Sequence, residues 1–115
     1  MDIVKEYESN LVNLIRDLRK KFCPFPFVIA NSGFGGFEET NERRVGIMEA
    51  QLAVSGDRKK YDDFVGNTFT VETRGFWRQK EDSPSNQGYH WWRNAETYFL
   101  IGDSMGKAMI SLISK

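Results

Sequence analysis

The sequence is poor in the residues that build metal sites, disulfides and membrane spans. It contains one cysteine, Cys23, and one histidine, His90. A lone cysteine closes no disulfide within the chain, and one cysteine with one histidine falls short of the ligand set of a typical zinc site. No apolar run approaches the roughly 20 residues that a membrane helix needs. We therefore expect no metal, no other cofactor and no membrane as a partner.

The chain also lacks net charge, because 16 basic residues balance 16 acidic residues. A neutral protein attracts polyanions weakly, which argues against nucleic acid as a partner. Residues 1–10 are polar and acidic, unlike the basic and then apolar start of a signal peptide. A length of 115 residues suits one small domain, so we expect residues 1–115 to form a single domain.

Three segments have the pattern of helices. Residues 3–22 carry acidic side chains early, basic side chains late, and apolar side chains at spacings of three and four. A second helix is predicted from Thr40 or Asn41 to about Val54, with Gly56 as its stop. The expected buried face of the first helix is Tyr7, Leu11, Leu14, Ile15, Leu18 and Phe22.

The third predicted helix covers residues 95–114. Asn94 precedes it and can cap its first turn. Gly102 and Gly106 lie four residues apart within it, a spacing that permits close packing, and we expect them to pack on the sheet. Its expected apolar face is Tyr98, Ile101, Met105, Ala108, Met109 and Leu112.

Two strands are predicted between these helices. Residues 27–30, FVIA, form a short continuous apolar run, which is typical of a strand buried on both faces and hence parallel. Residues 67–72 alternate β-forming side chains. The order α-β-α-β-α indicates an α/β fold with a parallel sheet. Because two strands are too few for such a sheet, we expect further strands from a larger domain or a partner.

The loops after the two strands are the predicted functional region, since ligands of parallel sheets bind at the carboxyl ends of the strands. Loop 31–40 contains the glycine-rich turn SGFGG, and loop 73–93 contains His90, so both should lie on one rim. The turn fails the phosphate-binding pattern because Glu38 stands where a third glycine is needed. Its glycines serve either backbone conformation or ligand contact through Gly35 and Gly36.

His90 is the candidate for proton transfer, because an imidazole titrates near neutral pH. A structural or merely exposed histidine is the alternative. Glu81 and Asp82 precede it on the same loop and could orient the ring, or form a solvated turn. Trp77, Trp91 and Trp92 could line a sugar- or acyl-binding surface, or one or two of them could fill the core.

Four stretches resemble, in order, the C-terminal part of SGNH-type carbohydrate esterases: VIANSGFGG, RRVGIMEAQLAV, FTVETRGFWR and SPSNQGYHWWRNAETYFLIGDSMGKAM. The most similar group is the sialate O-acetylesterase-like enzymes, which are similar to the acetylxylan esterases of carbohydrate esterase family six. The resemblance implies part of a three-layer α/β/α sandwich of the flavodoxin-like kind. It also implies removal of O-acetyl groups from sugars by a serine nucleophile, with His90 as the catalytic general base.

The chain departs from this family in two ways. The family's nucleophile serine and oxyanion-hole residues precede the first resembling segment, so we expect a C-terminal portion without the serine and near background activity alone. The family's acid stands three residues before the histidine, where this chain has Gln87, and Asp82 or Glu81 is the expected substitute. The expected partners are an acetylated carbohydrate and either a missing N-terminal half or a second copy that completes the sheet.

Two alternatives remain open at this point. The chain is either a non-catalytic module whose aromatic rim binds carbohydrate or protein, or an inactive truncated product. Family members are often exported, which implies export for the complete enzyme, while the location of this chain stays open.

Overall fold

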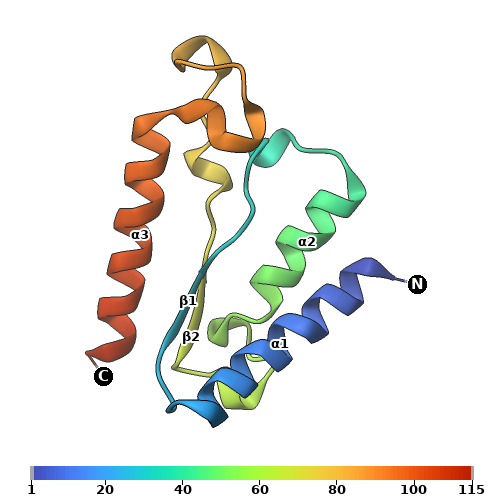
Figure 1. The fold of residues 1–115 in the computed structure, drawn as a ribbon, viewed down its shortest axis with the longest axis vertical. Coiled ribbons are helices and arrows are strands. Elements are labelled where there is room, and N and C mark those ends of the chain that lie inside the picture. Colours follow the sequence, from blue (N-terminus) through green and yellow to red (C-terminus); the bar gives the residue numbers. More distant parts are fainter. Residues whose placement is uncertain (1, 115) are drawn as a thin grey trace.

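The computed structural model describes residues 2–114 (Figure 1). These residues form α1, Ile3–Lys21; β1, Phe27–Ala30; α2, Glu42–Ala53; β2, Thr68–Val71; and α3, Ala95–Ile113, with short 3₁₀ turns in the connections. The α-β-α-β-α order and the element types are as predicted, and the bounds lie close to the predicted ones.

The sheet has two strands, β1 and β2, which pair in parallel with Phe27 opposite Thr68 and Ala30 opposite Val71. Helices α1 and α2 lie on one side of the strands and α3 lies on the other (Figure 1). The prediction of a mixed α/β fold with parallel strands is confirmed. The prediction that β1 is buried on both faces is wrong, because its four residues are only half-buried beside a single neighbouring strand.

Asparagine side chains begin two of the helices, as predicted. The Asn41 carboxamide oxygen accepts hydrogen bonds from the Arg43 and Arg44 amides at 3.1 and 3.2 Å, and Asn94 accepts one from the Thr97 amide at 3.0 Å. Gly56 is not the helix stop that was expected. It lies in the following 3₁₀ turn, where an added Cβ would stand 2.3 Å from the Phe64 carbonyl oxygen, so a close backbone approach requires glycine there.

The core lies between α1 and the start of the sheet. Its buried members are Val12, Ile15, Val54 and Phe64, with Phe27 and others packed against them. The predicted face of α1 is wrong at two positions, since Leu14 is 50% exposed and Phe22 is 70% exposed. Ile15 is buried as predicted, and Val12, which was not predicted, is buried beside it, so Leu14 lies on the outward side of the helix.

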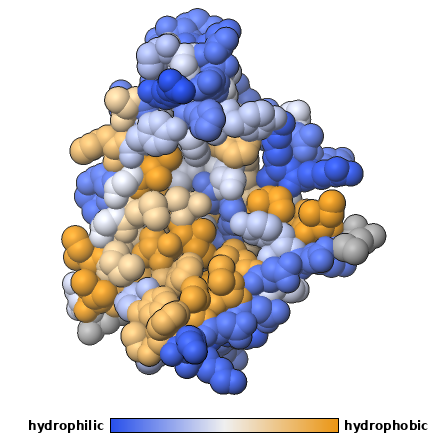
Figure 2. All heavy atoms as spheres, viewed as in Figure 1, coloured by the Kyte–Doolittle hydropathy of each residue, from blue (hydrophilic) through white to orange (hydrophobic). Residues whose placement is uncertain are grey.

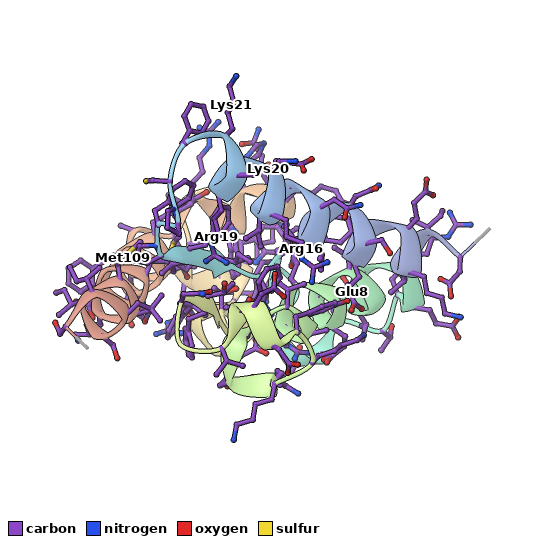
Figure 3. All side chains as sticks on the ribbon, turned by 90° about the horizontal axis from the view of Figure 1, so that it is seen from below. Glu8, Arg16, Arg19, Lys20, Lys21 and Met109 are labelled. Atoms are coloured by element: carbon purple, nitrogen blue, oxygen red, sulfur yellow. The ribbon has the colours of Figure 1, made fainter. Side chains whose placement is uncertain are left out.

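Arg19 joins the end of α1 to the starts of both strands (Figure 3). Its Nε donates to the Phe25 carbonyl at 3.1 Å, and its Nη2 donates to the Asn67 carbonyl and the Thr68 hydroxyl at 2.9 and 3.0 Å. The basic end of α1, which complements the helix dipole, therefore also fixes where the strands begin.

Helix α3 does not use its glycines for packing on the sheet. A Cβ added at Gly102 or Gly106 would meet no atom within 4 Å, so the expectation of close contact there is wrong. Figure 2 shows extensive hydrophobic surface beside α3 on the viewed face of the molecule. In residues 2–114, no helix has both the length and the apolar content needed to cross a membrane.

Candidate functional site

The loops that follow β1 and β2 meet at one end of the sheet and enclose a pocket. Its volume is about 590 Å³. The sequence prediction that the glycine turn and His90 share one rim agrees with this geometry, since Gly35 and His90 both line the pocket. The lining residues are Phe34, Gly35, Glu39, Arg44, Trp77, Asn86, Gln87, Gly88, Tyr89, His90 and Trp92.

A buried hydrogen-bond latch joins the two loops where they leave the strands. The Asn31 side-chain oxygen accepts from the Thr73 amide and from the Thr73 hydroxyl, each at 2.8 Å. The Asn31 side-chain nitrogen donates to the Glu72 carboxylate at 3.1 Å. Asn31 is 2% exposed and Thr73 fully buried. The latch therefore fixes the spacing of the two loops that form the pocket.

The glycines of the first loop are required by the backbone. Gly35 and Gly36 have φ of 91° and 62°, values that favour glycine. A Cβ at Gly36 would lie 3.1 Å from the Trp77 Cβ, and one at Gly33 would lie 2.7 Å from the Arg74 amide nitrogen. This supports the interpretation of a conformational turn. Gly35 lines the pocket, whereas Gly36 is buried beneath Trp77 and does not.

His90 is exposed at the pocket, and its ring makes no hydrogen bond with any residue between 2 and 114. Its backbone is held from both sides. The His90 amide donates to the Gln87 carbonyl at 3.0 Å, and its carbonyl accepts from the Tyr98 hydroxyl at 2.7 Å. The structure thus fixes the main chain of His90 and leaves the imidazole open to a ligand.

The backbone after His90 is strained. Trp91, Trp92 and Arg93 have φ of 52°, 56° and 56°, three consecutive bulky residues in the left-handed region. Each such residue costs on the order of 1–2 kcal/mol. Strain of this kind persists where surrounding contacts over-determine the conformation, and here it sets the direction of the two indole rings beside the imidazole.

Replacing Arg93 by glycine is expected to raise the free energy of unfolding by up to about 1 kcal/mol, because glycine adopts positive φ without the side-chain clash. Arg93 is exposed, so little packing is lost. Urea unfolding of Arg93→Gly against Arg93→Ala measures the effect. Equal or lower stability of the glycine variant would mean that the backbone here is not strained.

Phe34, Trp77, Tyr89 and Trp92 contribute aromatic rings to the pocket wall. Phe34 meets Tyr89 edge-on with centroids 5.4 Å apart, and Trp77 lies 5.4 Å from Trp92. Trp91 does not line the pocket but supports it, 5.7 Å from Trp77. These tryptophans are partly buried and lie outside the core cluster of Val12, Ile15, Val54 and Phe64. The Trp92 Nε1 atom is buried without a hydrogen-bond partner among residues 2–114.

Glu39 and Arg44 form a polar pair at the pocket that no pattern in the sequence predicted. Arg44 donates from Nη1 to Glu39 Oε2 at 2.9 Å and from Nη2 to the Tyr89 hydroxyl, and its guanidinium lies 5.0 Å from the centre of the Tyr89 ring. The Asn41 amide also donates to Glu39, at 2.9 Å. The Asn41 amide and the Arg44 guanidinium lower the pKa of Glu39, so its carboxylate stays ionised near neutral pH.

Glu39→Gln is expected to reduce stability at neutral pH and to have no such effect in acid. A carboxyl whose pKa is lowered by folding stabilises the protein above its unfolded pKa, and this contribution disappears as pH falls through the folded pKa. The measurement is urea unfolding of wild type and Glu39→Gln across the acidic range, with the exposed neighbour Glu38→Gln as the matched control. A difference that stays constant with pH would contradict this account.

The structure does not bring the two candidate acids together with His90. Glu81 and Asp82 are exposed on the 3₁₀ turn Lys80–Asp82 and do not line the pocket. Their carboxylates make no hydrogen bond or ion pair with residues 2–114. Gln87, which stands where the resembling family has its acid, does line the pocket.

Comparison with known proteins identified no relative. No family model, no curated protein and no solved structure matches this chain. In the part of the chain that the structure describes, no cluster of three or more His, Cys, Asp or Glu side chains could hold a metal ion.

Proposed function

We propose that this chain supplies the base-bearing part of a carbohydrate O-acetylesterase active site, within a partial three-layer α/β/α sandwich of SGNH type. One observation carries the proposal. His90 and the Gly35 turn follow two different parallel strands, yet both line one pocket in which the imidazole is open.

The chemistry assigned to His90 is general-base catalysis. His90 removes the proton from a serine hydroxyl as the serine oxygen attacks the acetyl carbonyl, and the imidazolium then protonates the departing sugar oxygen. A second cycle with water releases acetate and regenerates the serine. In the family that this chain resembles, the serine lies in a segment that precedes the resembling stretches. We therefore expect this chain alone to show activity near background.

We assign the placement of the imidazole chiefly to the hydrogen bonds that hold the main chain of His90. The Tyr98 hydroxyl and the Gln87 carbonyl hold the main chain of His90. Gln87 at the pocket can accept a hydrogen bond from the ring but cannot stabilise an imidazolium as a carboxylate does. Asp82 and Glu81 remain candidates for that role only if the completing segment moves their turn toward the pocket.

The pocket wall suits a sugar. Sugar rings present apolar C–H faces that pack on aromatic rings, and Phe34, Trp77, Tyr89 and Trp92 supply such rings. Glu39 and Arg44 can exchange hydrogen bonds with sugar hydroxyls at the same wall. Trp92 Nε1 can donate to a ligand acceptor once the ring moves to expose it.

Complementation tests the proposal. This chain is mixed with a polypeptide that supplies the N-terminal half of an SGNH-type sugar acetylesterase, and hydrolysis of a chromogenic acetyl ester and of acetylated xylo-oligosaccharide is followed. We expect activity in the mixture and only background with either polypeptide alone. A stable assembly without activity would reject the esterase assignment.

The same aromatic wall favours a second candidate, a module that binds carbohydrate without turnover. Titration of acetylated and plain oligosaccharides, followed by tryptophan fluorescence, separates the two functions. Saturable binding of both sugars alike, with no acetate released in the completed assembly, would favour the binding module.

A further inference from the structure

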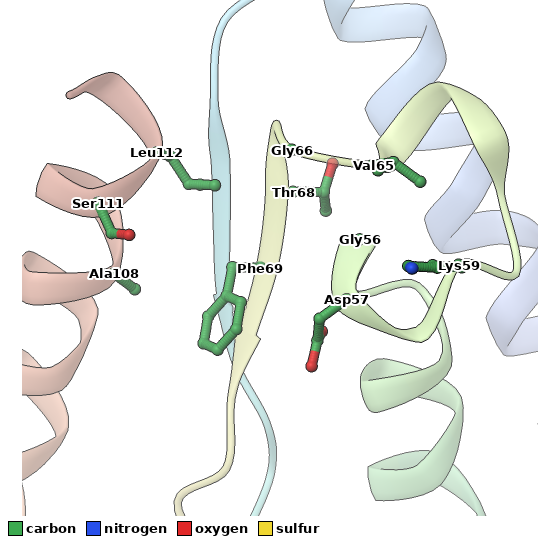
Figure 4. A pocket seen from close by; sticks show the side chains of 10 residues that line it. All are labelled: Gly56, Asp57, Lys59, Val65, Gly66, Thr68, Phe69, Ala108, Ser111 and Leu112. Atoms are coloured by element: carbon green, nitrogen blue, oxygen red, sulfur yellow. The ribbon is translucent and has the colours of Figure 1, made fainter. Parts of the chain in front are cut away.

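The two edges of the sheet differ in what covers them. On the outer edge of β2, the Thr70 amide donates to the Ser55 hydroxyl at 3.0 Å, and the Thr70 hydroxyl donates to the Gln51 carbonyl at 2.7 Å. A Cβ on Gly56 would stand 2.8 Å from the Thr68 carbonyl oxygen. Figure 4 shows Gly56 and Thr68 beside the hollow of about 380 Å³ between β2 and α3. The segment after α2 therefore closes this edge.

The outer edge of β1 is open. The Phe27 amide donates to the Asn67 carbonyl at 2.9 Å and the Asn31 amide to the Val71 carbonyl at 3.1 Å, so alternate residues of β1 bond to β2. The N–H and C=O groups of Val28 and Ala30 then point away from β2. Among residues 2–114 no further strand pairs there. Because these polar groups face away from β2 on a half-buried strand, they are placed to pair with an added strand.

Apolar surface flanks this open edge. On α3, Phe99, Ile110 and Ile113 are 69%, 61% and 62% exposed, and helical spacing puts them on one face with Gly102 and Gly106. The opposite side of α3 lines the hollow beside β2, through Ala108 and Ser111. The exposed face therefore points away from the hollow and from β2, and Figure 2 shows further hydrophobic surface between α3 and α1.

We propose that the outer edge of β1 accepts a strand from another polypeptide segment, with apolar side chains on both of its faces. An added strand would lie between helices on either side, and strands covered in this way are parallel and apolar almost throughout. Two copies of this chain joined edge to edge by a two-fold axis would pair antiparallel, so a second copy does not suit the site. The inference rests on the backbone and holds whether or not the pocket is an esterase site.

Amide hydrogen exchange of the full chain tests this inference. The probe is a synthetic peptide of alternating valine and isoleucine with two lysines at each end. We expect the peptide to slow exchange at Val28 and Ala30 by about tenfold or more, while Ile29, already bonded to β2, changes little. No slowing at saturating peptide would overturn the proposal. Exchange at these two amides that is already slow in the chain alone, and becomes slower as the chain concentration rises, would also overturn it, because the edge would then be paired with a second copy.

Two variants make the test specific. Ala30→Pro removes an outward N–H without removing a bond to β2, and it is expected to weaken peptide binding more than tenfold. Ile110→Glu, on the exposed face of α3, leaves β1 intact and is expected to weaken binding in the same direction. His90→Ala should bind the peptide normally. Failure of the strand-addition proposal can therefore be distinguished from failure of the esterase proposal. Unaltered binding by both Ala30→Pro and Ile110→Glu would contradict the proposed site.

Discussion

If the proposed esterase function is right, replacing His90 by alanine is expected to lower the kcat of the completed assembly by about a thousandfold or more. Without the imidazole, no group removes the serine proton or returns it to the leaving sugar oxygen. Loss of a general base costs roughly 10² to 10⁴ in rate, and about a millionfold in the serine protease subtilisin. Steady-state hydrolysis of a chromogenic acetyl ester by the complemented assembly measures the loss.

Matched variants separate loss of the base from loss of structure. The His90 ring makes no hydrogen bond within residues 2–114 and is exposed, so His90→Ala should fold with unchanged stability. Glu81→Gln and Asp82→Asn, on the same loop, show whether either carboxylate assists the base. A His90→Ala assembly that keeps the wild-type kcat would remove His90 from the mechanism.

Replacing Asn31 by alanine is expected to lower the free energy of unfolding by about 3 kcal/mol. The substitution leaves the buried Thr73 amide without its acceptor and removes the donor to Glu72. Each buried polar group left unsatisfied costs about 1–3 kcal/mol. Urea unfolding monitored by tryptophan fluorescence gives the free energy, and the same transition reports on the pocket because its tryptophans lie on the second loop.

A double-mutant cycle shows whether the latch acts as a unit. Thr73→Val keeps the shape of the side chain and removes the hydroxyl that bonds to Asn31. If the two side chains stabilise each other, the double variant should lose less than the sum of the single losses, with a coupling of about 1 kcal/mol or more. Strictly additive losses would contradict a latch between the loops.

Local signals were sufficient to predict much of the fold. Asn41 and Asn94 cap helices where expected because N-capping depends on a side chain and the two or three residues after it. The meeting of loops 31–40 and 73–93 followed from parallel pairing, since parallel strands end on one edge.

Features set by distant contacts escaped prediction. Arg44 bonds to Tyr89, 45 residues away, and no local spacing marks that pair. The left-handed conformation of Trp91 and Trp92 contradicts the ordinary preference of bulky residues, so no propensity predicts it. The outward position of Gly102 depends on which part of the apolar side of α3 meets the sheet. That apolar side is wider than the contact with the sheet, so spacing alone does not select the part that packs.

We propose that the pocket between the two strand-end loops binds acetylated sugar beside His90. The most direct measurement is an NMR titration of the isotopically labelled chain with an acetylated xylo-oligosaccharide and with the same sugar after deacetylation. We predict shifts of the Trp92 indole N–H and of the Gly35 and His90 amides, larger for the acetylated sugar, with Val28 and Ala30 unchanged. Shifts confined to residues outside the pocket, or none at millimolar sugar, would contradict the account.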